Sequence, residues 1–128
     1  MKLVDTSSWI EQLRKDGNPV VRERVESLLL AGEACWCPII RLELWNGARG
    51  EREKVALTEM AQEIPVLEID EPVWNKAFSL ARQAREKGIT VPASDLLVAA
   101  CARHHGVALE HSDSHFDLIA SLRKEQIP

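Results

Sequence analysis

Residues 93–102 read ASDLLVAACA, and we expect this stretch to lie at the centre of the fold. After Asp95 the segment is apolar almost all round, which is typical of a helix buried in the centre of a domain. His104-His105-Gly106 ends this helix, and Val107-Ala108-Leu109 then predicts a short strand. Asp95 therefore opens a central helix that leads directly into a strand.

The same alternation of strand and helix begins at the N-terminus. Lys2 to Val4 favours a strand that stops at Asp5, and Thr6-Ser7-Ser8 supplies N-cap chemistry for a helix. Ala34 to Cys37 predicts a short buried strand, and Pro38 is well suited to start a helix that runs to Gly47. Strands that alternate with helices predict an α/β sandwich with a mostly parallel sheet.

The middle of the chain predicts a charged helix over 51–63, a strand over 65–69 and then the longest helix, which closes at Lys87-Gly88. The apolar stripe expected to be buried on that last helix comprises Val73, Ala77, Leu80, Ala81 and Ala84.

Three of the four tryptophans are expected to pack in the core, namely Trp9, Trp36 and Trp74. Trp45 is the candidate for stacking on an RNA base or for contact with a partner.

The length of 128 residues fits one domain spanning residues 1–128. Apolar residues make up 45% of the chain, which is enough for a packed core. The net charge is −4, the wrong sign for bulk attraction to nucleic acid, so any RNA or DNA contact must be local. No apolar run is long enough to span a bilayer, which favours a soluble, cytoplasmic protein without membrane association. The odd count of 3 cysteines argues against a disulfide framework.

Three acids stand at the carboxyl end of a predicted strand or at the start of the following helix, namely Asp5, Asp95 and Asp113. Ligand sites of open parallel sheets form at this edge. Glu43 lies little more than one turn into the helix after the second strand and can point back toward the same edge. Capping and the helix dipole alone would account for Asp95 or Asp113 taken singly, but the set of four predicts a convergent site.

Four convergent carboxylates would repel one another unless a cation neutralises them. The sequence offers no obvious buried Lys or Arg for this purpose, and oxygen ligands of this kind suit Mg²⁺ or Mn²⁺. Such a centre activates water and stabilises charge on a phosphodiester, so a hydrolytic nuclease is the natural reaction class. Zinc is a weaker alternative, because the spacing of Cys35 and Cys37 lacks the usual two-residue gap. Its other ligands would come from His104, His105, His111 and His115.

The acidic segments resemble the four motifs of PIN-domain ribonucleases, in particular the VapC-type toxins of toxin–antitoxin systems. The segments, in chain order, are Val4-Asp5-Thr6-Ser7, Glu43-Leu44-Trp45-Asn46-Gly47, Ala93-Ser94-Asp95-Leu96-Leu97-Val98-Ala99-Ala100 and His111-Ser112-Asp113-Ser114-His115-Phe116. The resemblance implies a three-layer α/β/α sandwich and a Mg²⁺- or Mn²⁺-dependent endoribonuclease that is inhibited by a cognate antitoxin and forms a homodimer. His111 stands where many relatives carry a small hydroxyl residue.

By this resemblance, Asp5, Glu43, Asp95 and Asp113 are both the catalytic and the metal-binding residues. His115, near Asp113, is a candidate for phosphate binding or proton transfer, although a surface histidine without a role is the commoner case. Two alternatives stay open at this point. One is a processing or DNA-directed nuclease of the same fold, and the other is a non-catalytic α/β binding module whose acids serve only as caps.

Overall fold

A short parallel sheet forms the centre of the molecule in the computed structural model, which describes residues 1–122. Its strands are β1 (Lys2–Val4), β2 (Ala34–Cys35) and β3 (Ala108–Glu110), in the order β2-β1-β3. Leu3 of β1 pairs with Cys35 on one side and with Leu109 on the other. The central strand therefore brings its carboxyl end, Val4-Asp5, beside the carboxyl end of β3.

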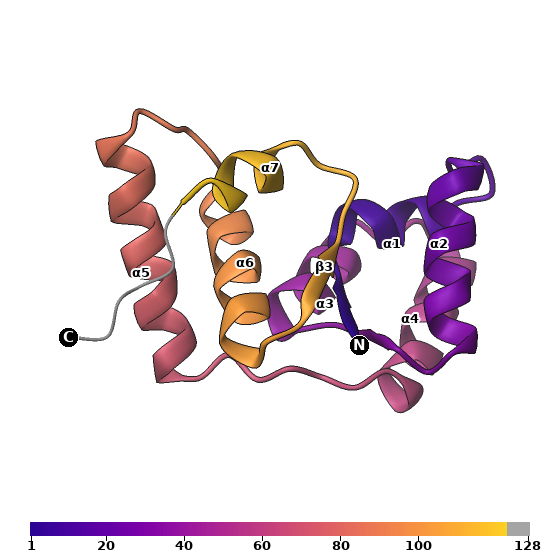
Figure 1. The fold of residues 1–128 in the computed structure, drawn as a ribbon. Helices are drawn as coiled ribbons and strands as arrows, with labels where there is room; N and C mark the ends of the chain where they lie inside the picture. Colours follow the sequence, from indigo (N-terminus) through magenta and orange to yellow (C-terminus); the bar gives the residue numbers. More distant parts are fainter. Residues whose placement is uncertain (123–128) are drawn as a thin grey trace.

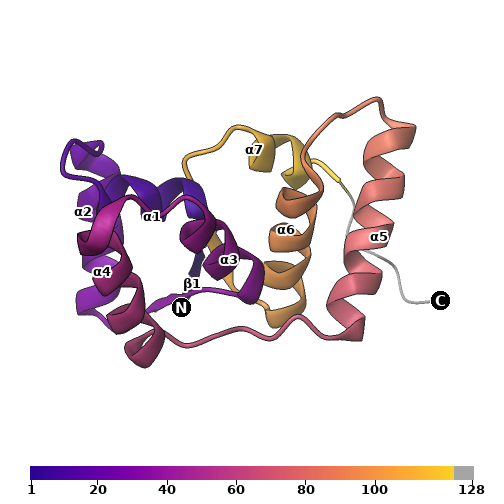
Figure 2. The ribbon, with the colours of Figure 1, turned by 180° about the vertical axis from the view of Figure 1, so that it is seen from behind.

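Helices follow each strand and cover the sheet from both sides. The helices of the described residues are α1 (Thr6–Leu13), α2 (Pro19–Leu30), α3 (Pro38–Asn46), α4 (Gly50–Glu63), α5 (Glu71–Glu86), α6 (Ala93–His105) and α7 (His115–Ala120). In both views of the ribbon, α5 and α6 lie on one side of the strands while α2 and α4 lie on the other (Figure 1, Figure 2). The predicted α/β architecture with a parallel sheet flanked by helices is confirmed.

Two tryptophans pack together in the core, one from α1 and one directly after β2. Trp9 and Trp36 are fully buried, and their ring centroids lie 6.1 Å apart in an edge-to-face arrangement. The guanidinium of Arg41 lies 5.3 Å from the ring centroid of Trp36. In α6, every residue from Asp95 to Ala102 is buried, as the apolar stretch predicts.

The predicted strand over 65–69 is wrong. Only one parallel bridge forms there, between Trp36 and Val66, with Leu67 donating its backbone N–H to the carbonyl of Trp36 at 2.8 Å. The reason lies in the partner segment, because Pro38 already begins α3 and leaves no extended backbone to which residues 68 and 69 could bond.

Trp74 and Ala81 of α5 were expected to be buried, and both are exposed. The buried face of α5 is formed by Val73, Ala77, Leu80 and Ala84, together with Ser79, and it packs on α6. Trp74, Phe78 and Ala81 recur at spacings of four and three, so they share a neighbouring stripe that α6 does not cover. Trp74 is 44% exposed and its ring lies against Phe78, with centroids 6.3 Å apart.

No helix within residues 1–122 is both long and apolar enough to cross a membrane. The predicted single domain over residues 1–128 stays a prediction, and its last part, 123–128, lies outside the described residues.

Candidate metal centre

Four acidic side chains meet at the carboxyl edge of the sheet. Asp5 follows β1 and Asp113 lies in the loop after β3, while Asp95 lies in the first turn of α6 and Glu43 lies within α3. The charge of Asp5 raises the pKa values of both Glu43 and Asp95, so all three are within electrostatic reach of one another. The structure thus brings together the four acids that the sequence singled out.

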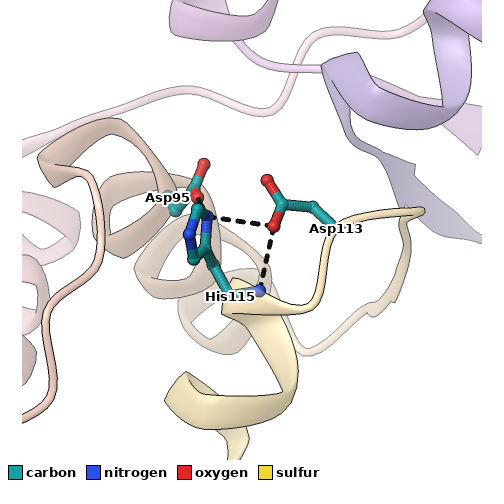
Figure 3. A group of neighbouring side chains, drawn as sticks. All are labelled: Asp95, Asp113 and His115. Atoms are coloured by element: carbon teal, nitrogen blue, oxygen red, sulfur yellow. Dashed lines mark hydrogen bonds and ion pairs between the residues drawn. The ribbon is translucent and has the colours of Figure 1, made fainter.

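Asp95 and Asp113 are joined through His115, the first residue of α7 (Figure 3). Nδ1 of His115 lies 3.0 Å from Oδ2 of Asp95 and 2.9 Å from Oδ1 of Asp113, and the same Asp113 oxygen accepts the backbone N–H of His115 at 2.9 Å. One ligand atom from each of the three residues lies within 4.8 Å of the others. His115 is therefore part of the acidic centre and not an isolated surface residue.

Asp5 is fixed by the start of the helix that follows it. Its Oδ2 accepts the backbone N–H of Ser7 at 3.0 Å and the hydroxyl of Ser7 at 2.6 Å, so Asp5 is the N-cap of α1. The residue is only 4% exposed, and both hydrogen bonds use Oδ2. Among residues 1–122, Oδ1 accepts no hydrogen bond and is available for a cation.

Glu43 is held by Thr6, whose hydroxyl donates to Oε1 at 2.8 Å. Burial raises the pKa of Glu43, the hydrogen bond from Thr6 lowers it, and the charges of Asp5 and Asp95 raise it again, with a net upward shift. Oε2 of Glu43 has no hydrogen-bond partner among residues 1–122. It is free to accept a hydrogen bond from water or to bind a cation.

Asp95 is buried within electrostatic reach of two of the other acids. Its pKa is raised first by burial and then by the charges of Asp5 and Asp113, while the hydrogen bond and charge of His115 act in the opposite direction. Within the described part of the chain, no lysine or arginine forms an ion pair with any of the four acids. The site is a set of oxygen donors with unbalanced negative charge, which is the chemistry that a hard divalent cation fits.

The zinc alternative has no support in the described residues. Cys35, Cys37 and Cys101 are all buried free thiols, and the group of residues that could hold a metal contains no cysteine.

His111 lies beside the acids. Its Nδ1 lies 3.4 Å from the backbone N of Asp113, and its ring centroid lies 5.0 Å from that of Phe116. Trp45 is 41% exposed, and no described residue makes a ring contact with it.

Two residues beside the site were missed by the sequence analysis. Glu110, the last residue of β3, is buried and pairs with Arg24 of α2. The criterion that identified Asp5 and Asp113, an acid at the end of a strand, also applies to Glu110. Glu110 directly follows the strand predicted over 107–109, as Asp5 follows the strand predicted over 2–4, so this signal was sufficient to identify it.

Comparison with known proteins identifies relatives along almost the whole chain. Residues 2–122 match the family model described as PIN domain. A VapC ribonuclease of Mycobacterium bovis, Mb1587, is 33% identical over 130 residues, covering 98% of this chain and 96% of the relative. Ribonuclease VapC21 of Mycobacterium tuberculosis is 30% identical over 112 residues, which cover 85% and 81% of the two chains.

The fold is also found among solved structures. A chain in the crystal structure of DNA-bound VapBC from Salmonella typhimurium superimposes with a TM-score of 0.78 at 23% identity, covering 98% of each chain. At this level of identity the likeness establishes the fold.

Proposed function

This chain belongs to the PIN-domain family and, within it, to the VapC ribonucleases, and from this premise we propose that it is an endoribonuclease toxin that a cognate antitoxin neutralises. The substrate is RNA, and the reaction is hydrolysis of a phosphodiester bond.

The activity requires a divalent cation, Mg²⁺ or Mn²⁺, held by Asp5, Asp95 and Asp113, with Glu43 acting directly or through a water molecule. One observation carries this proposal: the four acids share a site in which no described lysine or arginine balances their charge. Burial is the main cause of the raised pKa values of Asp95 and Glu43, and a cation in that position would offset the repulsion between the acids that adds to it. When bound, it stabilises negative charge on the phosphodiester and promotes ionisation of the attacking water.

The protein's own residues hold the donors in place. Ser7 fixes the Asp5 carboxylate through two hydrogen bonds, and Thr6 orients Glu43 so that Oε2 can accept a hydrogen bond from water. His115 joins Asp95 to Asp113. Because each of these contacts exists before substrate binds, little reorganisation accompanies the reaction.

Family membership supports the antitoxin as partner and a homodimer as the assembly, and the homodimer stays a prediction.

The net charge of −4 makes the acidic site unattractive to RNA without a cation, so binding of metal and binding of substrate are expected to be linked.

The test uses purified chain with an RNA oligonucleotide and a DNA oligonucleotide of matching sequence, each with EDTA or with Mn²⁺. We expect cleavage of the RNA only, in the presence of Mn²⁺ only. Equal cleavage of the DNA would instead assign a DNA-directed nuclease. Absence of cleavage, together with no Mn²⁺-induced rise in melting temperature, would assign a non-catalytic binding module.

A further inference from the structure

A second polar cluster lies next to the acidic centre and is built around Glu110. This residue is 7% exposed, and two guanidinium nitrogens of Arg24, a residue of α2, bond to its carboxylate. Nε of Arg24 lies 2.7 Å from Oε1 of Glu110, and Nη2 lies 3.3 Å from Oε2. The arrangement is the bidentate pairing that arginine favours with carboxylates.

Glu110 is held in its ionised form. Burial acts to raise its pKa, but the hydrogen bonds from Arg24 and Ser8 and the charges of Arg24 and Lys2 together leave the pKa below its ordinary value. An ionised carboxylate can only accept hydrogen bonds. The charge of Glu110 therefore dictates the orientation of every hydroxyl that contacts it.

Ser8 is the hydroxyl that Glu110 orients. Its side chain is fully buried, and Oγ lies 2.8 Å from Oε2 of Glu110 and 3.1 Å from Oγ of Ser112. A hydroxyl has one proton, and that of Ser8 is committed to the carboxylate. Ser112 must therefore donate its own hydroxyl proton to Ser8.

Ser112 is tied to the start of α1 at a second point. Its backbone N–H donates to Oγ of Ser7 at 3.0 Å, and the proton of that same hydroxyl goes to Oδ2 of Asp5 at 2.6 Å. The residue that follows Ser112 is Asp113. Two directed hydrogen bonds thus attach the loop that carries Asp113 to the residues that cap α1 and hold Asp5.

We propose that Glu110 is a positioning residue for the cation site: anchored by Arg24, it orients Ser8 and thereby fixes the loop over 111–114, so that Asp113 is held at its working separation from Asp5. The inference rests on the proposed metal centre. A role in stability alone accounts less well for the arrangement, because the Arg24 side chain is 47% exposed and an ion pair with an exposed partner contributes little to stability.

The test measures Mn²⁺ affinity by titration calorimetry and, separately, melting temperature in EDTA. Ser8→Ala removes the hydroxyl link to Ser112 but leaves the Glu110–Arg24 pair and the bond from the Ser112 backbone to Ser7. Glu110→Gln keeps the side-chain shape and removes the charge. Val25→Ala is the matched control, because Val25 is fully buried in α2 next to Arg24 in the sequence and its apolar side chain forms no hydrogen bond. This substitution removes buried apolar contacts but leaves the hydrogen bonds among Glu110, Ser8 and Ser112 in place.

We expect Ser8→Ala and Glu110→Gln to weaken Mn²⁺ binding by about tenfold, the scale typical of residues that orient metal ligands. Val25→Ala is expected to melt earlier but to bind Mn²⁺ like the unmodified chain. Unchanged Mn²⁺ affinity in folded Ser8→Ala, even with a lower melting temperature, would overturn the positioning role. If Glu110→Gln does not fold, Ser8→Ala, which deletes a single oxygen atom, decides alone.

Failure of the proposed function gives a different result. If the unmodified chain itself binds no Mn²⁺, the metal centre is wrong and the positioning role is overturned with it. If the unmodified chain binds Mn²⁺ and the two variants match it, only the role of Glu110 is wrong.

Discussion

Nδ1 of His115 lies 3.0 Å from Oδ2 of Asp95, so an imidazole lies beside a buried acid of the site. Its contact with Asp113 at 2.9 Å makes it the one described basic side chain that bridges two of the four acids. In the metal-free protein, His115 therefore offsets part of the repulsion that a divalent cation would otherwise neutralise.

His115→Ala should accordingly lower the melting temperature more in EDTA than in saturating Mn²⁺. The lost contacts contribute about 1 kcal/mol in the metal-free protein, as for an ordinary hydrogen bond, and the cation replaces them when it binds. Thermal scans of both proteins in the two buffers measure this difference. An equal loss with and without Mn²⁺ would show that His115 has only a local packing role.

Asp95→Asn tests the electrostatics through pH. Because the folded-state pKa of Asp95 is raised, chiefly by burial, the folded state binds protons more readily than the unfolded chain. The stability of the metal-free protein therefore falls as pH rises from the unfolded pKa through the folded pKa, and the penalty is fully present above that window.

We expect metal-free Asp95→Asn to melt at a higher temperature than the unmodified chain at neutral pH and to lose that advantage at acid pH. Melting curves in EDTA across this range check the sign. A variant that is less stable at neutral pH would mean that the carboxylate makes favourable contacts that outweigh the repulsion.

The choice of metal follows from the ligand set. Mg²⁺ and Mn²⁺ suit a compact group of carboxylates, whereas Ca²⁺ prefers looser and higher coordination. Cleavage should therefore stop in EDTA, return with Mn²⁺ or Mg²⁺ and return poorly with Ca²⁺. A rate that EDTA leaves unchanged would indicate metal-free chemistry and would make His115 the leading candidate for acid–base catalysis.

The antitoxin should compete with the metal. An arginine from its tail can pair with two of the four carboxylates and neutralise them as a cation would. Glu43 also lines a hollow with Ile10, Leu13 and Leu44, which offers apolar contacts beside the acids. We expect saturating Mn²⁺ and Asp95→Asn each to weaken binding of an arginine-containing antitoxin peptide. If neither change weakens binding of the peptide, the antitoxin inhibits at another part of the surface.

The alternation of strand and helix could be predicted from the sequence because each strand ends at a residue with a strong local signal. Asp5 and Pro38 mark helix starts, and the apolar run after Asp95 marks a buried helix. The placement of Trp74 could not be predicted, since an apolar stripe on a helix does not reveal how wide a face its neighbour covers. Glu110 and Arg24 are 86 positions apart in sequence, and only the tertiary fold brings them together.

The convergence of the four acids was predictable for a similar reason. The carboxyl ends of parallel strands meet at one edge, so Asp5 and Asp113 had to be neighbours once the sheet was parallel. The contacts that orient them were not predictable, because the hydroxyls of Ser7 and Ser8 carry no signal beyond helix capping.

The central claim is that the acids hold the cation required for RNA cleavage, and the most direct measurement is the cleavage rate of Asp5→Asn and Asp95→Asn at saturating Mn²⁺. Asp70→Asn is the matched control, because Asp70 also caps a helix, accepting the backbone N–H of Val73 at 3.4 Å, and lies at the start of α5. We predict losses of about 100-fold or more for the two site variants, the scale of lost transition-state electrostatics, and an unchanged rate for the control. A rate near that of the unmodified chain in either folded site variant would contradict the account.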